Sequence, residues 1–187
     1  MEILARVPAS CLWLARSHGQ TEQNLSREAE ARGIDPRRLI FAPLETYSAY
    51  IARYDLADLF LDTRWFNAHT TAIDALRRGV PVLTLAGEAM CSRLGASVLH
   101  AAGLPELVTH SLEQYKSRAI ELATDRAAFA ALRSKLQRTL PGSALMDLPG
   151  RTRELEAAYL EMIKRQRAGL APETFHVKAI PQRLNWF

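Results

Sequence analysis

The chain has 187 residues, of which 48% are hydrophobic and 24% are charged, enough to form one domain with its own core. This composition excludes a disordered, collagen-like or low-complexity protein, and no apolar run approaches the roughly 20 residues of a membrane-spanning helix. Lys and Arg outnumber Asp and Glu by 24 to 20, an excess too small and too dispersed to indicate a nucleic-acid-binding face.

The first residues and the cysteine content indicate a reducing, cytoplasmic setting. Residues 1–6 lack the basic stretch followed by an apolar stretch that marks a signal peptide. Cys11 and Cys91 are the only cysteines, too few for a disulfide framework in a chain of this length. The histidines are isolated and no H-E-x-x-H motif occurs, so we expect no metal site.

Short apolar segments alternate with helical segments over the first 108 residues. The run Cys11–Ala15 predicts a buried strand, and the following segment predicts a helix from Thr21, its cap, to Arg32, before Gly33. Further strands are predicted at 38–42, 58–62, 81–85 and 106–108, with helices at 47–54, 70–78 and 88–101. This alternation predicts βαβ units with right-handed crossovers, and therefore an α/β fold with a parallel sheet.

After the last predicted strand the sequence turns helical. The pattern predicts helices at 112–123 and 126–140, then a break at Pro141-Gly142-Ser143. A long amphipathic helix is predicted over 151–167, and Gly169 ends it. Its apolar face contains Leu155, Tyr159, Leu160 and Ile163.

The loop after the third predicted strand holds a candidate anion site. In open parallel sheets ligands bind beyond the carboxyl ends of the strands, and a helix is predicted to begin here at His69 or Thr70. Free backbone N–H groups and the helix dipole favour an anion there, and the side chains of His69, Thr70 and Thr71 add donors. Asp74 lies one turn further along the same helix face and suits the two hydroxyls of a ribose. The alternative is that Thr70 or Thr71 only caps the helix and His69 is a surface residue.

The loop and helix after the second predicted strand hold candidates for binding a base. Tyr47, Tyr50 and Arg53 share roughly one helix face, and an aromatic ring can stack on a nucleobase while Arg bonds its carbonyls. The alternative is that both tyrosines pack on the core and Arg53 pairs with Asp55 or Asp58. Neither G-x-G-x-x-G nor G-x-x-x-x-G-K-[ST] occurs, which disfavours a dinucleotide oxidoreductase and a P-loop NTPase.

A series of short motifs, in this order along the chain, resembles the protein O-GlcNAc transferase family. The series covers about residues 7–103, with weaker similarity to about residue 169. Its pieces are Val7-Pro8 with Leu12-Trp13-Leu14, Phe41-x-Pro43, Leu56-Ala57-Asp58-x-x-Leu61-Asp62-Thr63, Asn67-x-His69-Thr70-Thr71-x-x-Asp74-Ala75-Leu76, Gly79-x-Pro81-Val82-x-Thr84, and Gly87-Glu88 with Ser92-Arg93.

The resemblance implies the C-terminal lobe of a GT-B type glycosyltransferase, in which two Rossmann-like lobes face each other across a cleft. We therefore expect a Rossmann-like parallel sheet flanked by helices, with its first strand missing. Residues 1–145 would form a partial UDP-sugar-binding lobe, 146–169 a long helix that packs back on that lobe, and 170–187 a tail.

The resemblance also implies roles for individual residues, with a UDP-sugar as donor and no metal or further cofactor. The expected contacts are His69, Thr70 and Thr71 at the diphosphate, with His69 also assisting the leaving group, Asp74 at the ribose hydroxyls, Arg53 and Tyr50 at the uracil, and Glu45 at the uracil through its backbone. Tyr47 stands where family members often carry a Lys toward the ribose or phosphate, which would weaken donor binding.

The family places its catalytic His and acceptor contacts in an N-terminal lobe, usually preceded by tetratricopeptide helices. An earlier strand and loop carry a Gln and a Lys near the diphosphate. None of these segments is in the 187 residues, so we expect the isolated chain to be inactive.

The sequence therefore favours the donor-binding portion of an inverting, metal-independent transferase that moves a sugar, GlcNAc above all, from a UDP-sugar to Ser or Thr of a protein acceptor. One alternative is a truncated, non-catalytic remnant that at most binds UDP. Another is a lobe of a different GT-B transferase. Retaining members carry Glu-x7-Glu here, and the residue eight after Glu88 is Ala96, which disfavours that alternative.

Overall fold

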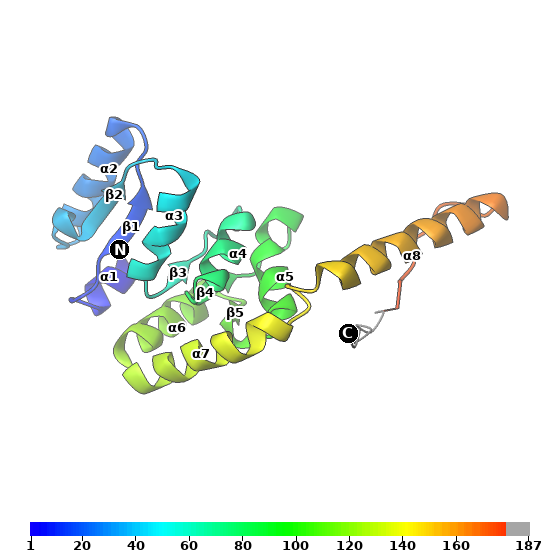
Figure 1. Cartoon of the computed structure of the whole chain (residues 1–187). Coiled ribbons are helices and arrows are strands. Elements are labelled where there is room, and N and C mark those ends of the chain that lie inside the picture. Colours follow the sequence, from blue (N-terminus) through cyan, green and yellow to red (C-terminus); the bar gives the residue numbers. More distant parts are fainter. Residues whose placement is uncertain (179–187) are drawn as a thin grey trace.

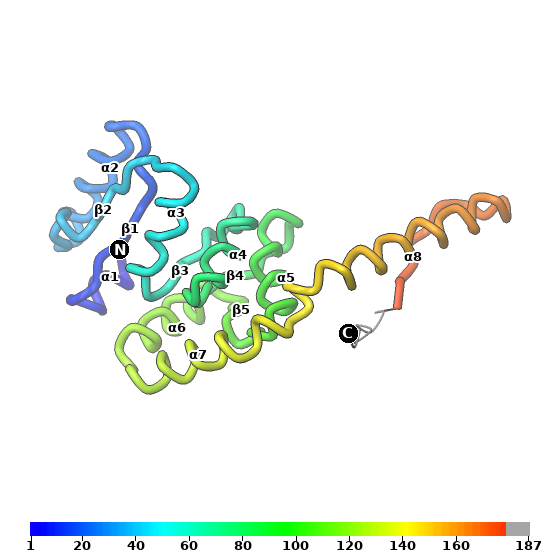
Figure 2. The backbone as a smooth tube through the Cα atoms, viewed as in Figure 1, coloured from blue at the N-terminus to red at the C-terminus, as the bar shows by residue number. Residues whose placement is uncertain are grey.

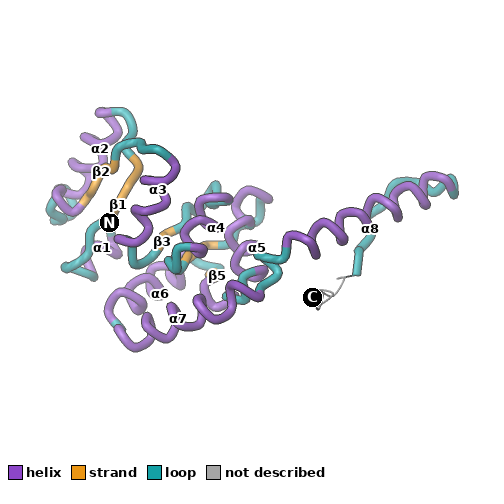
Figure 3. The backbone as a smooth tube through the Cα atoms, in the orientation of Figure 1, coloured by secondary structure: helices purple, strands orange, loops and turns teal. Residues whose placement is uncertain are grey.

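The computed structural model describes residues 1–178, and it confirms an α/β architecture of parallel strands flanked by helices (Figure 1). The strands are β1 (Leu12–Ala15), β2 (Leu39–Ala42), β3 (Phe60–Leu61), β4 (Val82–Leu85) and β5 (Val108–Thr109). The helices are α1 (Glu2–Arg6), α2 (Gly19–Glu30), α3 (Tyr47–Arg53), α4 (Thr70–Arg77), α5 (Leu94–Ala101), α6 (Leu112–Thr124), α7 (Arg126–Thr139) and α8 (Leu148–Arg167). Figure 3 shows the strands and helices alternating along the first part of the chain.

The strands form two parallel sheets rather than the single sheet that the sequence predicted. β1 pairs with β2, and β3, β4 and β5 form the second sheet in that order. In the common doubly wound order 3-2-1-4-5-6, the first strand lies between the second and the fourth. If β1 and β3 hold the second and fourth places, the break between the two sheets falls at the place of the first strand. The part of the chain that the structure describes has no strand there.

The larger core surrounds β4, whose four residues are all buried. Helices α4 and α5 cover one face of its sheet, and α6 and α7 lie against the other (Figure 1). Leu76, Leu83, Leu99 and Leu136 are each fully buried where these layers meet. Burial of such side chains contributes about 1.5–3 kcal/mol each, so this core positions the loops at the carboxyl ends of β3 and β4.

A smaller core joins the first sheet to α1 and α2. Its buried residues are Leu4, Ala29, Ile34 and Leu39. Helix α1, which the sequence did not predict, lies beside α6 in the tube of Figure 2, and Lys116 Nζ contacts Glu2 Oε2 at 2.7 Å. Five residues are too few to carry a helical period, so the contact with α6 stabilises this helix rather than its own propensity.

Helix boundaries differ from the predictions where a cap or a turn intervenes. Helix α2 begins at Gly19, with His18 at the N-cap, so the predicted cap Thr21 lies inside it. The segment predicted as one helix over 88–101 contains a 3-10 turn at Met90–Ser92 before α5. Gly33 and Gly79 have φ of 70° and 78°, and they end their helices as predicted because glycine adopts this conformation without strain.

Helix α8 leaves the body of the protein and extends away from it (Figure 1). The expected packing of this helix back on the lobe is therefore absent among residues 1–178. Its apolar side chains Leu155, Tyr159, Leu160 and Ile163 are exposed instead. Residues 171–178 have no helix or strand, and the rest of the predicted tail lies outside the described residues. None of the described helices combines the length and the apolar character needed to cross a membrane.

Candidate functional site

The loop after β3 and the start of α4 enclose a hollow of about 460 Å³. Its wall includes the predicted anion-binding residues, and ten residues line it: Phe60, Leu61, Asp62, Thr63, Phe66, Asn67, Ala68, His69, Thr70 and Thr71. The hollow lies at the carboxyl end of β3, where ligands bind in parallel sheets. His69, Thr70 and Thr71, which follow one another in the chain, therefore all line this one hollow.

Asp62 organises the loop that forms this hollow. It is 4% exposed, and its Oδ1 accepts from the backbone N–H of Thr63 at 2.8 Å and of Ala68 at 2.7 Å. Its Oδ2 accepts from the hydroxyl of Thr84 on β4 at 2.6 Å. Burial raises the pKa of Asp62, while these three hydrogen bonds act to lower it. One carboxylate thus holds both ends of the 63–68 loop to the sheet.

Asn67 makes a second set of buried contacts in the same loop. It is 1% exposed; its Nδ2 donates to Thr63 O at 2.7 Å, and its Oδ1 accepts from Gly95 N at 3.2 Å. Its backbone N–H donates to Cys91 O at 2.8 Å. These bonds tie the loop to the start of α5, so Asn67 is held both by its own loop and by the segment from Cys91 to Gly95.

The start of α4 presents donors to the hollow. His69 is the N-cap residue and makes no side-chain cap bond, so the predicted capping role falls to neither Thr70 nor Thr71. Within residues 1–178, no protein acceptor contacts the backbone N–H of Thr70 or Thr71. Unpaired N–H groups at a helix start, together with the helix dipole, favour an anion at this position.

Phe66 packs on the imidazole of His69. The two ring centroids are 5.2 Å apart and the rings are inclined by 15°, which is a stacked arrangement. Phe66 is nevertheless 65% exposed, and it is one of the residues that line the hollow.

Asp74 lies on α4, one turn beyond the anion site, and is buried. The hydroxyl of Tyr47 donates to its Oδ1 at 3.3 Å. Partial burial of the hydroxyl and the negative charge of Asp74 raise the pKa of Tyr47. Tyr47, which the resemblance places where family members often carry a Lys, therefore contacts the predicted ribose carboxylate through a neutral phenol.

Tyr50 and Tyr54 connect α3 to α4. Their hydroxyls are 2.6 Å apart, and the Tyr54 hydroxyl donates to Thr71 O at 3.1 Å. Burial, followed by the hydrogen bond from Tyr50, raises the pKa of Tyr54 well above its ordinary value. Tyr50, which the resemblance places at the uracil, thus lies in an aromatic cluster directly linked to the anion site.

Arg53 holds the loop after β2. Its guanidinium donates to Pro43 O at 2.7 Å and pairs with Glu45 at 3.1 Å. The alternative pairing with Asp55 or Asp58 is wrong, since Asp55 pairs with Arg78 and Arg53 pairs with Glu45. The structure therefore joins the two residues, Arg53 and Glu45, that the resemblance assigns to the same base.

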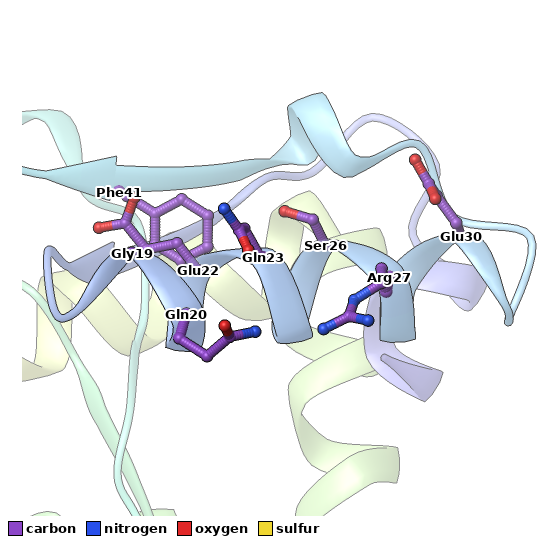
Figure 4. Close-up of a pocket in the computed structure, with 8 residues that line it drawn as sticks. All are labelled: Gly19, Gln20, Glu22, Gln23, Ser26, Arg27, Glu30 and Phe41. Carbon is purple, nitrogen blue, oxygen red and sulfur yellow. The ribbon is translucent and has the colours of Figure 1, made fainter.

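A larger hollow of about 810 Å³ runs along α2 and holds none of the predicted site residues (Figure 4). Its lining in the close-up is mostly polar side chains of α2, with Phe41 of β2 at one end. Ser92, which belongs to the last piece of the motif series, is buried and donates to Ala89 O at 3.0 Å, so it holds the loop after β4.

Three residues of this region were not predicted as functional: Asp62, Asn67 and Phe66. Asp62 and Asn67 entered the sequence analysis only as members of the motif series, with no role assigned to either. The role of Asp62 could not be predicted because its partner Thr84 lies 22 residues away in the sequence. No local sequence pattern predicts the stack between Phe66 and His69.

A parallel α/β lobe with a hollow at the start of a helix, beyond the carboxyl end of a strand, is typical of a nucleotide-binding lobe. The family model described as glycosyl transferase family 41 matches residues 1–155, and the chain belongs to this family. The family resemblance inferred from the motifs is thereby confirmed.

Relatives and a solved structure agree with this assignment. The chain is 36% identical over 170 residues to the UDP-N-acetylglucosamine–peptide N-acetylglucosaminyltransferase of Caenorhabditis elegans, covering 91% of this chain and 15% of that protein. It is also 36% identical over 176 residues to a probable enzyme of the same description from Arabidopsis thaliana, covering 94% and 18%. A solved structure of a Thermobaculum terrenum O-GlcNAc transferase mutant superposes with a TM-score of 0.82 at 35% identity, covering 89% of this chain and 33% of that one. The chain thus spans less than a fifth of these two relatives.

Proposed function

We propose that this chain is the donor-binding part of a protein O-GlcNAc transferase that moves GlcNAc from UDP-GlcNAc to Ser or Thr of a protein acceptor. The gathering of His69, Thr70 and Thr71 around one hollow at the start of α4 carries the proposal. The names of the two relatives, which describe N-acetylglucosaminyl transfer to peptides, support the choice of sugar and acceptor.

The donor would lie along the edge of the two sheets with its uracil near α3. Arg53 and Glu45 would hold the base side, with Tyr50 presenting a ring to the uracil. Asp74 would accept the ribose hydroxyls beside Tyr47. The diphosphate would then occupy the hollow at the start of α4.

The start of α4 supplies the positive potential that a diphosphate needs. The N–H groups of Thr70 and Thr71, the helix dipole and an N–H of the His69 imidazole all favour negative charge, so we propose that donor binding requires no metal ion. The charge that develops on the leaving diphosphate would meet the same donors, and His69 would stabilise it by hydrogen bonding.

An N-terminal lobe and tetratricopeptide helices are proposed as partners, because the chain spans only a fraction of its relatives. We also propose a cytoplasmic location. The two cysteines, Cys11 and Cys91, are both free thiols, as a reducing compartment would keep them.

Titrating the chain with UDP and with uridine, by calorimetry or ligand-observed NMR, tests the site. His69→Ala and Thr71→Ala should weaken UDP binding about tenfold or more and uridine binding less, because only UDP carries the diphosphate. Asp74→Ala and Arg53→Ala should weaken both ligands. Thr152→Ala, on α8 far from the hollow, serves as the matched threonine control. If UDP binds and none of the four site variants changes its affinity, the site lies elsewhere.

A further inference from the structure

Tyr54 lies where the two halves of the proposed donor site meet. It is the C-cap residue of α3, directly after Arg53, and its hydroxyl contacts α4. The side chains proposed for the base lie on or beside α3, and those proposed for the ribose and the diphosphate lie on α4. Helix α3 follows the first sheet and α4 follows β3 of the second sheet, and no strand within residues 1–178 pairs across the two sheets. Contacts between α3 and α4 therefore set the spacing of the two halves.

The hydroxyl of Tyr54 makes two hydrogen bonds. It donates to Thr71 O at 3.1 Å, and it lies 2.6 Å from the hydroxyl of Tyr50. A phenol carries a single hydrogen, so Tyr54 accepts from Tyr50 when it donates to Thr71 O. A carbonyl oxygen has two lone pairs, so this bond does not compete with the helical hydrogen bonds of α4. The result is a directed chain from Tyr50 through Tyr54 to the first turn of α4.

The ring of Tyr54 is fixed by two aromatic neighbours. Its centroid is 5.4 Å from that of Tyr50, edge to face at 76°, and 6.4 Å from that of Phe60 on β3. Phe60 also lines the hollow at the start of α4. A change that removes only the hydroxyl of Tyr54 keeps this packing and therefore tests the hydrogen bonds alone.

A second hydrogen bond joins the same two helices, from the Tyr47 hydroxyl to Asp74 Oδ1 at 3.3 Å. Tyr47 is 67% exposed, and a ribose placed at Asp74 would compete for this bond. Tyr54 is only half-buried as well, but it bonds to a backbone carbonyl that no group of the donor needs. The chain through Tyr54 is therefore the link between α3 and α4 that can persist when a nucleotide binds.

We propose that Tyr54 is a positioning residue for donor binding, which holds Tyr50 and the start of α4 in one fixed arrangement so that a nucleotide meets both at once. This inference rests on the proposed function. A ligand that spans two subsites binds more tightly when their spacing is already correct, because less conformational freedom is lost on binding. Tyr54 itself contacts no part of the ligand and acts only through Tyr50 and Thr71.

The experiment measures the affinity of the whole chain for UDP, uridine and inorganic pyrophosphate by ligand-observed NMR. Tyr54→Phe should weaken UDP and uridine about three- to tenfold, because both ligands reach from Tyr50 on α3 to Asp74 on α4. Pyrophosphate contacts only the start of α4, so its affinity should change less than twofold. Thr71→Ala should weaken pyrophosphate, which shows that this probe reports on the start of α4.

Two further variants separate positioning from a loss of stability. Tyr50→Phe removes the other hydroxyl of the chain. Combined with Tyr54→Phe, it should weaken UDP no more than Tyr54→Phe alone, because both changes break the same chain. Tyr115→Phe is the matched control, since the Tyr115 hydroxyl also donates to a backbone carbonyl, Asp62 O at 2.9 Å, but lies on α6. It should lower the free energy of unfolding as Tyr54→Phe does, and leave the affinity for uridine within twofold of the wild type.

Three outcomes overturn the role of Tyr54 and leave the proposed function standing. In the first, Tyr54→Phe binds UDP as the wild type does. In the second, it weakens pyrophosphate as much as UDP, so the hydroxyl only supports the start of α4. In the third, the effects of Tyr50→Phe and Tyr54→Phe on UDP multiply, so the two hydroxyls act independently. If the wild-type chain binds neither UDP nor uridine, the proposed function is wrong, and the role of Tyr54 is wrong with it.

Discussion

Replacing Asp62 by Ala should unfold the anion loop and destabilise the whole chain. The buried carboxylate accepts three hydrogen bonds, from Thr63 N, Ala68 N and the Thr84 hydroxyl. Each buried donor left without an acceptor costs about 1–3 kcal/mol, although the Thr84 hydroxyl can turn and water can enter the space. The substitution also removes the unfavourable free energy of burying a carboxylate, which offsets part of the cost of the unpaired donors. We expect a net loss of about 3 kcal/mol in the free energy of unfolding, a large share of the stability of a domain of this size.

Asp62→Asn separates the contribution of the hydrogen bonds to stability from the contribution of the charge, because asparagine is neutral and similar in shape. Both backbone donors, Thr63 N and Ala68 N, bond to the same oxygen, Oδ1, which an asparagine retains. Its Nδ2 can replace Oδ2 by donating to the Thr84 oxygen. The structure therefore predicts a loss below about 1 kcal/mol for Asp62→Asn.

The wild type and Asp62→Asn should also differ in how their free energy of unfolding depends on pH. Burial raises the pKa of Asp62 above the ordinary value of about 3.9. At a pH between the unfolded and the folded pKa, the folded chain therefore keeps a proton that the unfolded chain releases. This contribution to stability is complete below the unfolded pKa and is lost as pH rises through the raised folded pKa. Asparagine does not titrate, so Asp62→Asn does not lose this stability as pH rises. The free energy of unfolding of Asp62→Asn, relative to that of the wild type, should therefore increase as pH rises above about 4.

Urea unfolding, followed by circular dichroism between pH 3.5 and 7, measures both effects, and UDP titration reports on the loop. The reasoning is refuted if Asp62→Ala is as stable as Asp62→Asn, because the three bonds would then contribute nothing. A difference between wild type and Asp62→Asn that does not change with pH would refute the raised pKa.

Three further predictions concern Gly95, the apolar side chains of α8 and the activity of the isolated chain. A Cβ on Gly95 would meet the Asp62 carboxylate at a distance that real contacts do not show, so Gly95→Ala should lower the free energy of unfolding by about 1–3 kcal/mol. Gly142→Ala, which meets nothing within 4 Å, should change stability little in the same urea titration. The exposed apolar side chains of α8, Leu155, Tyr159, Leu160 and Ile163, should cause self-association at high concentration. Light scattering should show a lower mass when Leu155 and Tyr159 are both replaced by Ser, and a wild type that stays monomeric would contradict this. The 187-residue chain alone should transfer no labelled GlcNAc from UDP-GlcNAc to any protein, and detectable transfer would show that it holds its own catalytic base.

The local features of this protein were determined by its sequence. Short apolar runs separated by helical periods predicted the first four strands and most of the helices, because these signals depend on neighbours along the chain. The last strand was predicted at 106–108, where the structure has a 3-10 turn at Pro105–Leu107 followed by β5. The ends of the helices before Gly33 and Gly79 were predicted for the same reason. The residues from Asn67 to Asp74 predicted a helix that follows a strand, with an anion site at its start. The structure confirms the helix and shows a hollow at its start, while the anion site stays a prediction.

Only the tertiary structure decided how distant segments meet. The partners of Asp62 and Asn67 include Thr84 and Gly95, 22 and 28 residues away, and no local period encodes such a hydrogen bond. The division of the strands into two sheets depends on which strand edges are close enough to pair, and the exposure of α8 depends on what lies beside it. Phe66 reads in the sequence as one more apolar residue. Its stack on His69 lies in a loop that Asp62 ties to β4 and Asn67 ties to the start of α5, and that arrangement is a property of the folded chain.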